Sequence, residues 1–281
     1  MIEIHDETIQ RLELVANKLR RMVLDLTWVG QCGHPGGSMS LADILSCLYF
    51  EVMNIDSQRP DWDERDRFIL SKGHAAPVYY SVLAQRGYFP TDLLSTYGQL
   101  DTLLQGHPDM HTPGVDMSSG SLGQGLSPAV GMALGAKLKG LSFRTYVVIG
   151  DGECQEGQIW EAAMVAPRFK LDNLTVIVDK NRLQLTDFTD QVVPVEPMAD
   201  KWKAFNWHTV EIDGHSVREI LAAIDEAKRV KNQPTAIIAH TTKGKGISFM
   251  EDQAAWHSKA PNDAEHAQAM QELVAACKGD L

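Results

Sequence analysis

Two short polar segments carry the residues best suited to chemistry. Residues 150–153 (GDGE) and 179–181 (DKN) each follow an apolar run rich in β-branched residues, and Asn181 comes thirty positions after Asp151. Carboxylate, amide and backbone carbonyl oxygens suit Mg²⁺, which readily bridges to phosphate oxygens. Glycines allow close approach of backbone to ligand, and a helix opening near Glu156 would offer free N–H groups to a phosphate. GDG alone is also typical of a tight turn, but its pairing with DKN predicts a magnesium and diphosphate site.

Four histidines lie in polar, glycine-rich contexts. They are His34 in GHPGG, His74 in SKGHA, His107 in GHP, and His257 after the segment TTKGKG at 241–246. Histidine titrates near neutrality and can donate or accept a proton in place. Each one singly is typical of a loop histidine bonded to backbone, but together they predict one shared site at which protons are donated and accepted. The other histidines are expected to be surface or packing residues: His5, His111, His208, His215, His240 and His266.

The elements that must position these residues alternate between strand and helix. A long amphipathic helix is expected from Ile9 to Leu26, ending near Gly30, because apolar residues recur there at three- and four-residue spacing. A second helix should follow residues 35–38, with Ser38 or Ser40 as its N-cap. Short, almost continuously apolar runs indicate strands buried on both faces of a parallel sheet, so we expect an α/β fold with right-handed crossovers. The expected strands are 68–70, 146–149, 175–178, 209–212 and 236–239, and the expected further helices are 127–138, 156–166, 217–229 and 264–277.

Length and composition narrow the class of protein. The chain has 281 residues, of which 44% are hydrophobic and 22% charged, and we expect a single domain over 1–281. Two long stretches without regular pattern, 97–120 and 182–200, are expected to be loops, the first of them functional. A net charge of −11 argues against nucleic acid or an anionic membrane as partner. Scattered cysteines, the lack of an apolar signal core and the lack of a membrane-spanning run predict a cytoplasmic protein with reduced thiols.

The motifs resemble those of the transketolase family, in order and over almost the whole chain. Residues 150–162 (GDGECQEGQIWEA), followed by Asn181, are similar to the diphosphate and Mg²⁺ motif of thiamine-diphosphate enzymes. The histidine segments, together with GSLGQG at 120–125 and TTKGKG at 241–246, resemble transketolase segments. The resemblance implies the thiamine-diphosphate-binding fold, with thiamine diphosphate and Mg²⁺ as cofactors, and the diphosphate-binding half of the enzyme.

The resemblance also implies roles for individual residues. Asp151, Asn181 and the carbonyl of Leu183 would bind the metal, while His34, His107 and His257 would contact the substrate. Glu156 either belongs to a carboxylate network between subunits or is a first-turn glutamate favoured by the helix dipole. The sequence departs from the family at Ser121, where proline is usual, and at Arg182, where glycine is common. The implied cofactor contacts are His74, Gly120, Ser121, Leu122, Asp151, Gly152, Glu156, Asn181 and His257.

Nothing in the sequence resembles the pyrimidine-binding or C-terminal domains of a transketolase. The resemblance therefore implies a split enzyme in which a second chain, in an α2β2 assembly, supplies the activating glutamate and the pyrimidine pocket. The expected reaction transfers a two-carbon ketol unit from a ketose phosphate to an aldose acceptor. The alternatives are the α subunit of a 2-oxo acid dehydrogenase, a deoxyxylulose-phosphate synthase-like enzyme, and a non-catalytic cofactor-binding subunit. The choice between a phosphorylated ketose and pyruvate as donor would separate the first two from a transketolase.

Overall fold

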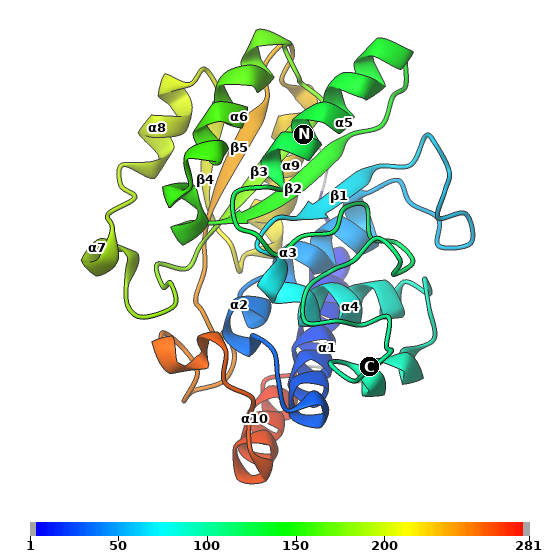
Figure 1. The fold of residues 1–281 in the computed structure, drawn as a ribbon, viewed down its shortest axis with the longest axis vertical. Helices are drawn as coiled ribbons and strands as arrows, with labels where there is room; N and C mark the ends of the chain where they lie inside the picture. The colour runs from blue at the N-terminus through cyan, green and yellow to red at the C-terminus, as the bar shows by residue number, and fades with distance from the viewer. Residues whose placement is uncertain (1–3, 278–281) are drawn as a thin grey trace.

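A five-stranded sheet, every strand of it parallel to its neighbours, forms the centre of the computed structural model, which describes residues 4–277 (Figure 1). The strand order is β1-β2-β3-β5-β4, and Gly150 at the end of β2 pairs with Asp179 near the end of β3. The expected parallel α/β fold is confirmed. The strands are β1 (Arg67–Leu70), β2 (Thr145–Gly150), β3 (Leu174–Lys180), β4 (His208–Asp213) and β5 (Thr235–His240).

Helices cover both faces of the sheet because the strand side chains point alternately to either face. Val147 and Ile149 pack into one core with α5, α6 and α8, while Tyr146 and Val148 pack into a second core with α1, α3, α4 and α9. Figure 1 shows α5 and α6 in front of the sheet. The helices are α1 (Asp6–Gly30), α2 (Pro35–Met39), α3 (Ala42–Cys47), α4 (Ala76–Gln85), α5 (Leu126–Lys139), α6 (Gly157–Arg168), α7 (Thr189–Val192), α8 (Met198–Ala204), α9 (Val217–Arg229) and α10 (Asp263–Ala275).

The expected N-cap of the second helix is wrong. Helix α2 begins at Pro35, with His34 as its N-cap residue. Proline is suited to the first helical position because its missing N–H group would have no partner there. Ser38 therefore lies within the helix and donates to the carbonyl of His34 at 2.8 Å, and Ser40 points instead to Asp179.

Two further differences concern helices that the sequence pattern did not indicate. Helix α4 was not expected, since every residue from Ala76 to Ala84 is buried and no polar face marks its period. The stretch 182–200 is not a continuous loop, because it contains α7 and the beginning of α8. The stretch 97–120 is irregular, as expected, and leads into α5 at the carboxyl edge of the sheet.

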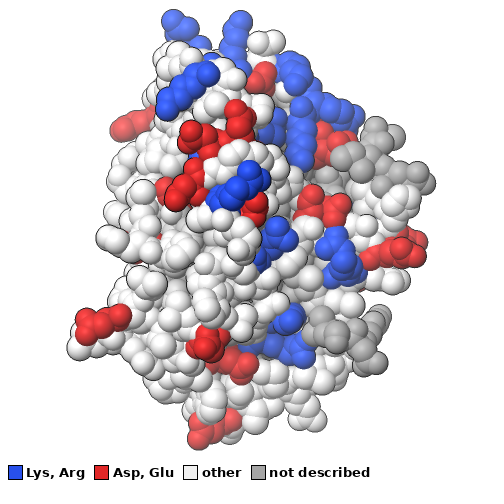
Figure 2. Space-filling view, turned by 90° about the vertical axis from the view of Figure 1, so that its right-hand side faces the viewer, with Lys and Arg blue, Asp and Glu red and all other residues white. Residues whose placement is uncertain are grey.

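Charged residues are dispersed over the face of the molecule that Figure 2 shows. Acidic and basic side chains are interspersed there, with Lys and Arg gathering toward the upper end. None of the helices within residues 4–277 is long and apolar enough to cross a membrane. Cys47 and Cys154 are buried.

Candidate functional site

Loops that follow β1, β2, β3 and β5 surround a cavity of about 330 Å³ at the carboxyl edge of the sheet. This is the edge at which open parallel sheets bind ligands. The predicted site residues that line the cavity are His74, Leu122, Asp151, Gly152, Glu156, Asn181, Leu183 and His257. Those outside its lining are Gly120, Ser121, His34 and His107. A Cβ on Gly120 would lie 3.2 Å from the His107 ring, so this loop lies against that histidine.

Asp151 places a buried carboxylate directly at the end of β2. The side chain is 2% exposed; Oδ1 accepts from the N–H of Gly152 at 2.8 Å and Oδ2 from the N–H of Arg182 at 2.7 Å. Burial and the nearby Asp179 carboxylate raise the pKa of Asp151 to about 6. Because a carboxylate has about four acceptor positions, two remain for a ligand. A divalent cation there would offset the unfavourable burial of the charge.

Asn181 and Leu183 could supply the other metal ligands. Asn181 is buried; its Nδ2 donates to Asp179 at 3.0 Å, which orients the amide, and its Oδ1 accepts from the N–H of Leu183 at 3.1 Å. No group of three or more His, Cys, Asp or Glu side chains within residues 4–277 has an arrangement that could hold a metal ion. One carboxylate, one amide oxygen and one carbonyl suit Mg²⁺, which commonly takes few protein ligands and completes its shell with phosphate and water.

Arg182, between these two residues, adopts a left-handed backbone conformation with φ of 63°. Glycine tolerates this conformation best, which accounts for glycine being common at this position in the family. The arginine side chain extends toward Asp190, with 3.6 Å between the charged groups, and does not line the cavity. The departure from glycine at this position therefore adds no cation to the cavity lining.

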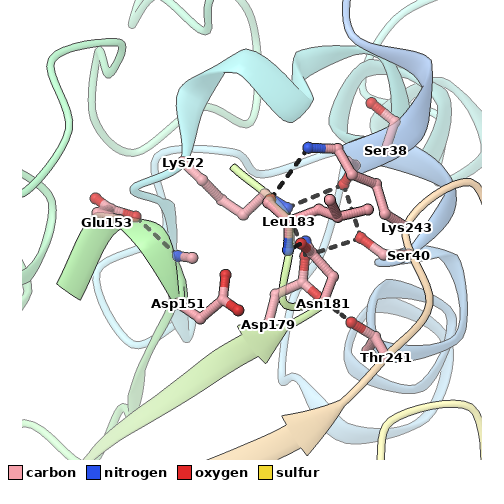
Figure 3. Close-up of polar contacts among 12 residues, drawn as sticks. Ser38, Ser40, Lys72, Asp151, Glu153, Asp179, Asn181, Leu183, Thr241 and Lys243 are labelled. Atoms are coloured by element: carbon pink, nitrogen blue, oxygen red, sulfur yellow. Dashed lines mark hydrogen bonds and ion pairs between the residues drawn. The ribbon is translucent and has the colours of Figure 1, made fainter. Parts of the chain in front are cut away.

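A buried ion pair lies beneath the cavity and was not predicted. Lys72 is 1% exposed; its Nζ donates to Asp179 Oδ2 at 2.5 Å and to the carbonyl of Gly37 at 3.1 Å. Asp179 also accepts from Ser40 at 2.8 Å and from Thr241 (Figure 3). Burial alone would raise the pKa of Asp179, but the Lys72 ammonium and these donors lower it below its ordinary value. The pair joins α2, β3 and the loops after β1 and β5.

Lys243 is a second buried cation that sequence reasoning missed. Its Nζ donates to the carbonyl of Leu183 at 3.2 Å and contacts Nδ1 of His257 at 2.7 Å. Burial and the Lys72 charge lower the pKa of Lys243 to about 8. Two buried ammonium groups lining one cavity favour an anionic ligand.

The four predicted histidines form one cluster, of which His74 and His257 line the cavity. The ring centre of His34 lies 5.2 Å from that of His74, 5.4 Å from that of His257 and 6.2 Å from that of His107. Burial, and next the charge of His107, lower the pKa of His34 to about 4. Burial and the Lys243 charge lower the pKa of His257 to about 3. Buried, neutral imidazoles can each donate and accept one hydrogen bond.

Two details of this cluster point to a bound ligand. The Nδ1 atom of His34 is buried and has no hydrogen-bond partner in the part of the chain that the structure describes. Such an atom is costly unless a ligand or water satisfies it. In His257, Nδ1 accepts from Lys243, so the proton of the neutral ring is on Nε2, which is left as a donor.

His215 also proves to be more than a surface or packing residue. Its Nδ1 contacts Asp43 Oδ2 at 2.7 Å, and its Nε2 accepts from the N–H of Thr242 at 2.8 Å. Asp43 in turn pairs with Arg20 of α1. This chain of contacts supports the loop that carries Lys243.

The unpredicted residues do have a sequence signal. Lys72 lies within SKGHA, Asp179 within DKN and Lys243 within TTKGKG, all motifs that were noted for a neighbouring residue. A charged residue inside a glycine-rich segment at a strand end is therefore worth testing as part of the site. Whether it is buried cannot be read from its type.

The chain is an α/β protein with an all-parallel sheet. One edge of this sheet carries oxygen ligands, buried lysines and neutral histidines, which suit an anionic ligand bridged by a metal. Residues 12–277 match the family model described as "Transketolase, thiamine diphosphate binding domain", and the chain belongs to this family. The resemblance of the sequence motifs to transketolase is thereby confirmed.

Similar proteins divide into separate subunits and longer transketolases. The chain is 46% identical over 263 residues to a 6-deoxy-6-sulfo-D-fructose transketolase subunit, SqwG, of Clostridium sp. (strain MSTE9), covering 93% of this chain and 96% of the relative. It is 44% identical to an apulose-4-phosphate transketolase subunit from Actinobacillus succinogenes, covering 93% of this chain and 95% of that relative. Transketolase from Leishmania mexicana superposes with a TM-score of 0.90 at 33% identity, covering 96% of this chain but 42% of that chain. The chain is thus similar in length to the subunits and spans less than half of the longer enzyme.

Proposed function

We propose that the chain is the cofactor-binding subunit of a two-chain transketolase. It binds thiamine diphosphate through Mg²⁺ and, with a second chain, transfers a two-carbon ketol unit from a ketose phosphate to an aldose acceptor. The observation that carries the proposal is the convergence of Asp151, Asn181 and the Leu183 carbonyl with the histidine cluster at one cavity. The family assignment supports thiamine diphosphate as the cofactor.

The residues present fit this cofactor. Asp151, Asn181 and Leu183 would hold Mg²⁺, and Lys72 and Lys243 would offset the charge of the diphosphate. Gly152 begins a short helical turn, Gly152–Gln155, and its backbone allows close approach of phosphate oxygens. The nearby His74, Gly120, Ser121, Leu122 and Glu156 would complete the cofactor contacts. When bound, thiamine diphosphate supplies the nucleophilic carbon and electron sink that cleavage of a ketose requires.

The histidines would bind and orient the sugar. Because burial and nearby cations hold His34 and His257 neutral, each can form a hydrogen bond with a hydroxyl without carrying charge. His257 presents its Nε2–H, fixed by the contact of Nδ1 with Lys243. His107, on the loop against Gly120, would contact the donor's terminal hydroxyl. These contacts would place the reacting bond and assist proton movement at the hydroxyls.

A second chain is proposed for two reasons. The relatives of similar length are named as subunits, and the Leishmania transketolase continues well beyond the matched part. In addition, apolar side chains at and near the cavity mouth are exposed in this chain. Leu122 is 38% exposed and Leu185 63%, and both line the cavity. The partner would cover them and supply the activating glutamate and pyrimidine pocket, in an α2β2 assembly.

The donor sugar is proposed only by class. The two relatives of similar length compared above are named for 6-deoxy-6-sulfo-D-fructose and for apulose 4-phosphate. We therefore extend the proposal from common pentose and hexose phosphates to ketoses with an anionic group at the far end. The cytoplasm is the proposed location.

A ketol-transfer assay tests the proposal. The full chain is assayed with thiamine diphosphate and Mg²⁺, first alone and then with the protein that co-purifies from its native source. Activity with a ketose donor in the second sample, and none in the first, is expected. Activity of the chain alone would contradict the need for a partner, and transfer from pyruvate but not from ketoses would contradict a transketolase.

A further inference from the structure

The carboxylate of Glu153 connects three separate segments of the cavity. The side chain is 3% exposed. Oε1 accepts from the Ser71 hydroxyl and from the N–H of Gly123 at 2.8 Å, and Oε2 accepts from the N–H of Gly150 at 2.9 Å. The donors come from the loop after β1, the loop before α5 and the end of β2.

Each of these donors is next to residues proposed to hold the cofactor. Ser71 precedes Lys72, Gly150 precedes Asp151, and Gly123 follows Leu122. The Ser71 hydroxyl also accepts from the N–H of Gly125 at 3.1 Å, which ties the loop before α5 to the loop after β1 a second time. One buried carboxylate thus determines the relative positions of loops that are 82 and 30 residues away in sequence from Glu153.

The loop before α5 is also held to α6, where the side chains of Gln124 and Gln158 contact each other at 2.6 Å. Gly123 has φ of 83°, and a Cβ there would lie 2.7 Å from Cβ of Glu156. The chain must therefore pass Glu156 without a side chain at position 123, so Gly123 itself is held through hydrogen bonds of its backbone. The bond from Gly123 to Glu153 is one of them.

The Glu153 carboxylate is poorly placed to bind the metal. Three of its roughly four acceptor positions are occupied by protein donors, and the close-up shows its carboxylate pointing away from that of Asp151 (Figure 3). A charged acceptor with several donors gives stronger and more directional bonds than a neutral one.

We propose that Glu153 is a positioning residue that holds the loops around residues 71–74, 120–125 and 150–152 in the arrangement that receives the cofactor diphosphate. This inference rests on the proposed function, because it assigns Glu153 a part in binding the same cofactor. Glu153 acts through the neighbouring residues and touches neither metal nor substrate.

The test replaces Glu153 with glutamine, which keeps the shape but sets an amide –NH2 group against at least one backbone N–H donor, that of Gly150 or of Gly123. We measure thiamine-diphosphate affinity by calorimetry at saturating Mg²⁺, on the full chain with its co-purifying partner. The expected result is an affinity about 10- to 100-fold weaker, as is typical when a residue that supports a ligand site is lost. In the assay, the KM for thiamine diphosphate should rise while kcat at saturating cofactor stays within about twofold.

Two further variants keep the test decisive. Ser71→Ala removes one donor while leaving the carboxylate, and should give a smaller loss of affinity that is not additive with Glu153→Gln. Glu272→Gln is the matched control, because Glu272 also accepts from a serine hydroxyl and a backbone N–H, those of Ser248, but does not line the cavity. It should leave cofactor affinity unchanged.

The outcomes separate the two proposals. Wild-type affinity in Glu153→Gln, or a fall in kcat with no rise in KM, would overturn the positioning role while leaving the proposed function intact. No binding of thiamine diphosphate by the wild-type complex would overturn both.

Discussion

The ammonium group of Lys243 lies 3.2 Å from the carbonyl oxygen of Leu183, the oxygen proposed as a magnesium ligand. A carbonyl oxygen has two lone pairs, so this contact marks a position where positive charge is favourable. One lone pair could accept from Lys243 while the other binds Mg²⁺, and the lysine would keep its contact with His257. Lys243 is then expected to contribute to cofactor affinity rather than to compete with the metal.

Replacing Lys243 with methionine should weaken thiamine-diphosphate binding. A hydrogen bond to a charged group contributes about 1.5–3 kcal/mol, so an affinity roughly 10- to 100-fold lower is expected by calorimetry. Lys245→Met is the matched control, since Lys245 lies two positions further along the same loop and pairs with Glu251 at the surface. Tighter binding by Lys243→Met would mean that the lysine competes with Mg²⁺.

Magnesium should bind well only together with the diphosphate. The protein offers one carboxylate, from Asp151, and two neutral oxygens, from Asn181 and Leu183, which are few ligands for Mg²⁺ alone. Titration with Mg²⁺ should show little heat without thiamine diphosphate and clear binding with it. Asp151→Asn should lower the joint affinity at least tenfold, beyond the effect of Asp63→Asn at an exposed position. Tight Mg²⁺ binding without cofactor would point to a different ligand set.

The buried Lys72–Asp179 pair should matter for stability. Removing one partner leaves a buried charge unpaired, which typically costs about 3–5 kcal/mol, so Lys72→Met should lower the free energy of unfolding by that order. The double variant Lys72→Met with Asp179→Asn should recover part of the loss, because no unpaired charge remains. Urea unfolding of the cofactor-free chain measures both. Equal losses in the single and double variants would show that hydrogen bonds from Ser40 and Thr241, rather than the charge pair, dominate.

Much of the fold and the position of Asp151 and Asn181 at one sheet edge could be predicted because the relevant signals are local. A continuous β-branched run predicts a buried strand, and a polar residue directly after it must lie at the sheet edge, which is why Asp151 and Asn181 could be paired. Helix α4 gave no such signal, since burial on all sides removes the polar face.

The supporting residues could not be predicted, because their roles depend on tertiary contacts. Lysine is almost never fully buried unless it is paired, so nothing in the types of Lys72 and Lys243 indicates burial. Glu153 and Ser71 are 82 positions apart, and His215 and Asp43 are 172 apart. Family resemblance identified the histidines, but the neutral state of His34 follows from its burial and from the charges around it.

The left-handed conformation of Arg182 gives a prediction about backbone strain. Arg182→Gly should leave thiamine-diphosphate affinity within about twofold, because the backbone N–H that donates to Asp151 is retained. Arg182→Val should lower the free energy of unfolding by about 1–3 kcal/mol and weaken cofactor binding, since a β-branched residue is strained at φ of 63°. Urea unfolding and calorimetry compare the two. A loss of affinity in the glycine variant as large as in the valine variant would assign the arginine side chain a direct role.

The depressed pKa of His34 predicts an acid-sensitive fold. In the unfolded chain the pKa is near its ordinary value of 6.5, whereas in the folded chain it is about 4. Between these values the unfolded state binds more protons, so the free energy of unfolding falls as the pH is lowered from 6.5 to 4. His34→Asn removes this term, and its unfolding free energy should fall less than that of the wild type between pH 7 and pH 5 in urea titrations. His111→Asn, at an exposed histidine outside the cluster, should follow the wild type. Parallel curves for wild type and His34→Asn would mean that the histidine is solvated enough to keep its ordinary pKa in the folded chain.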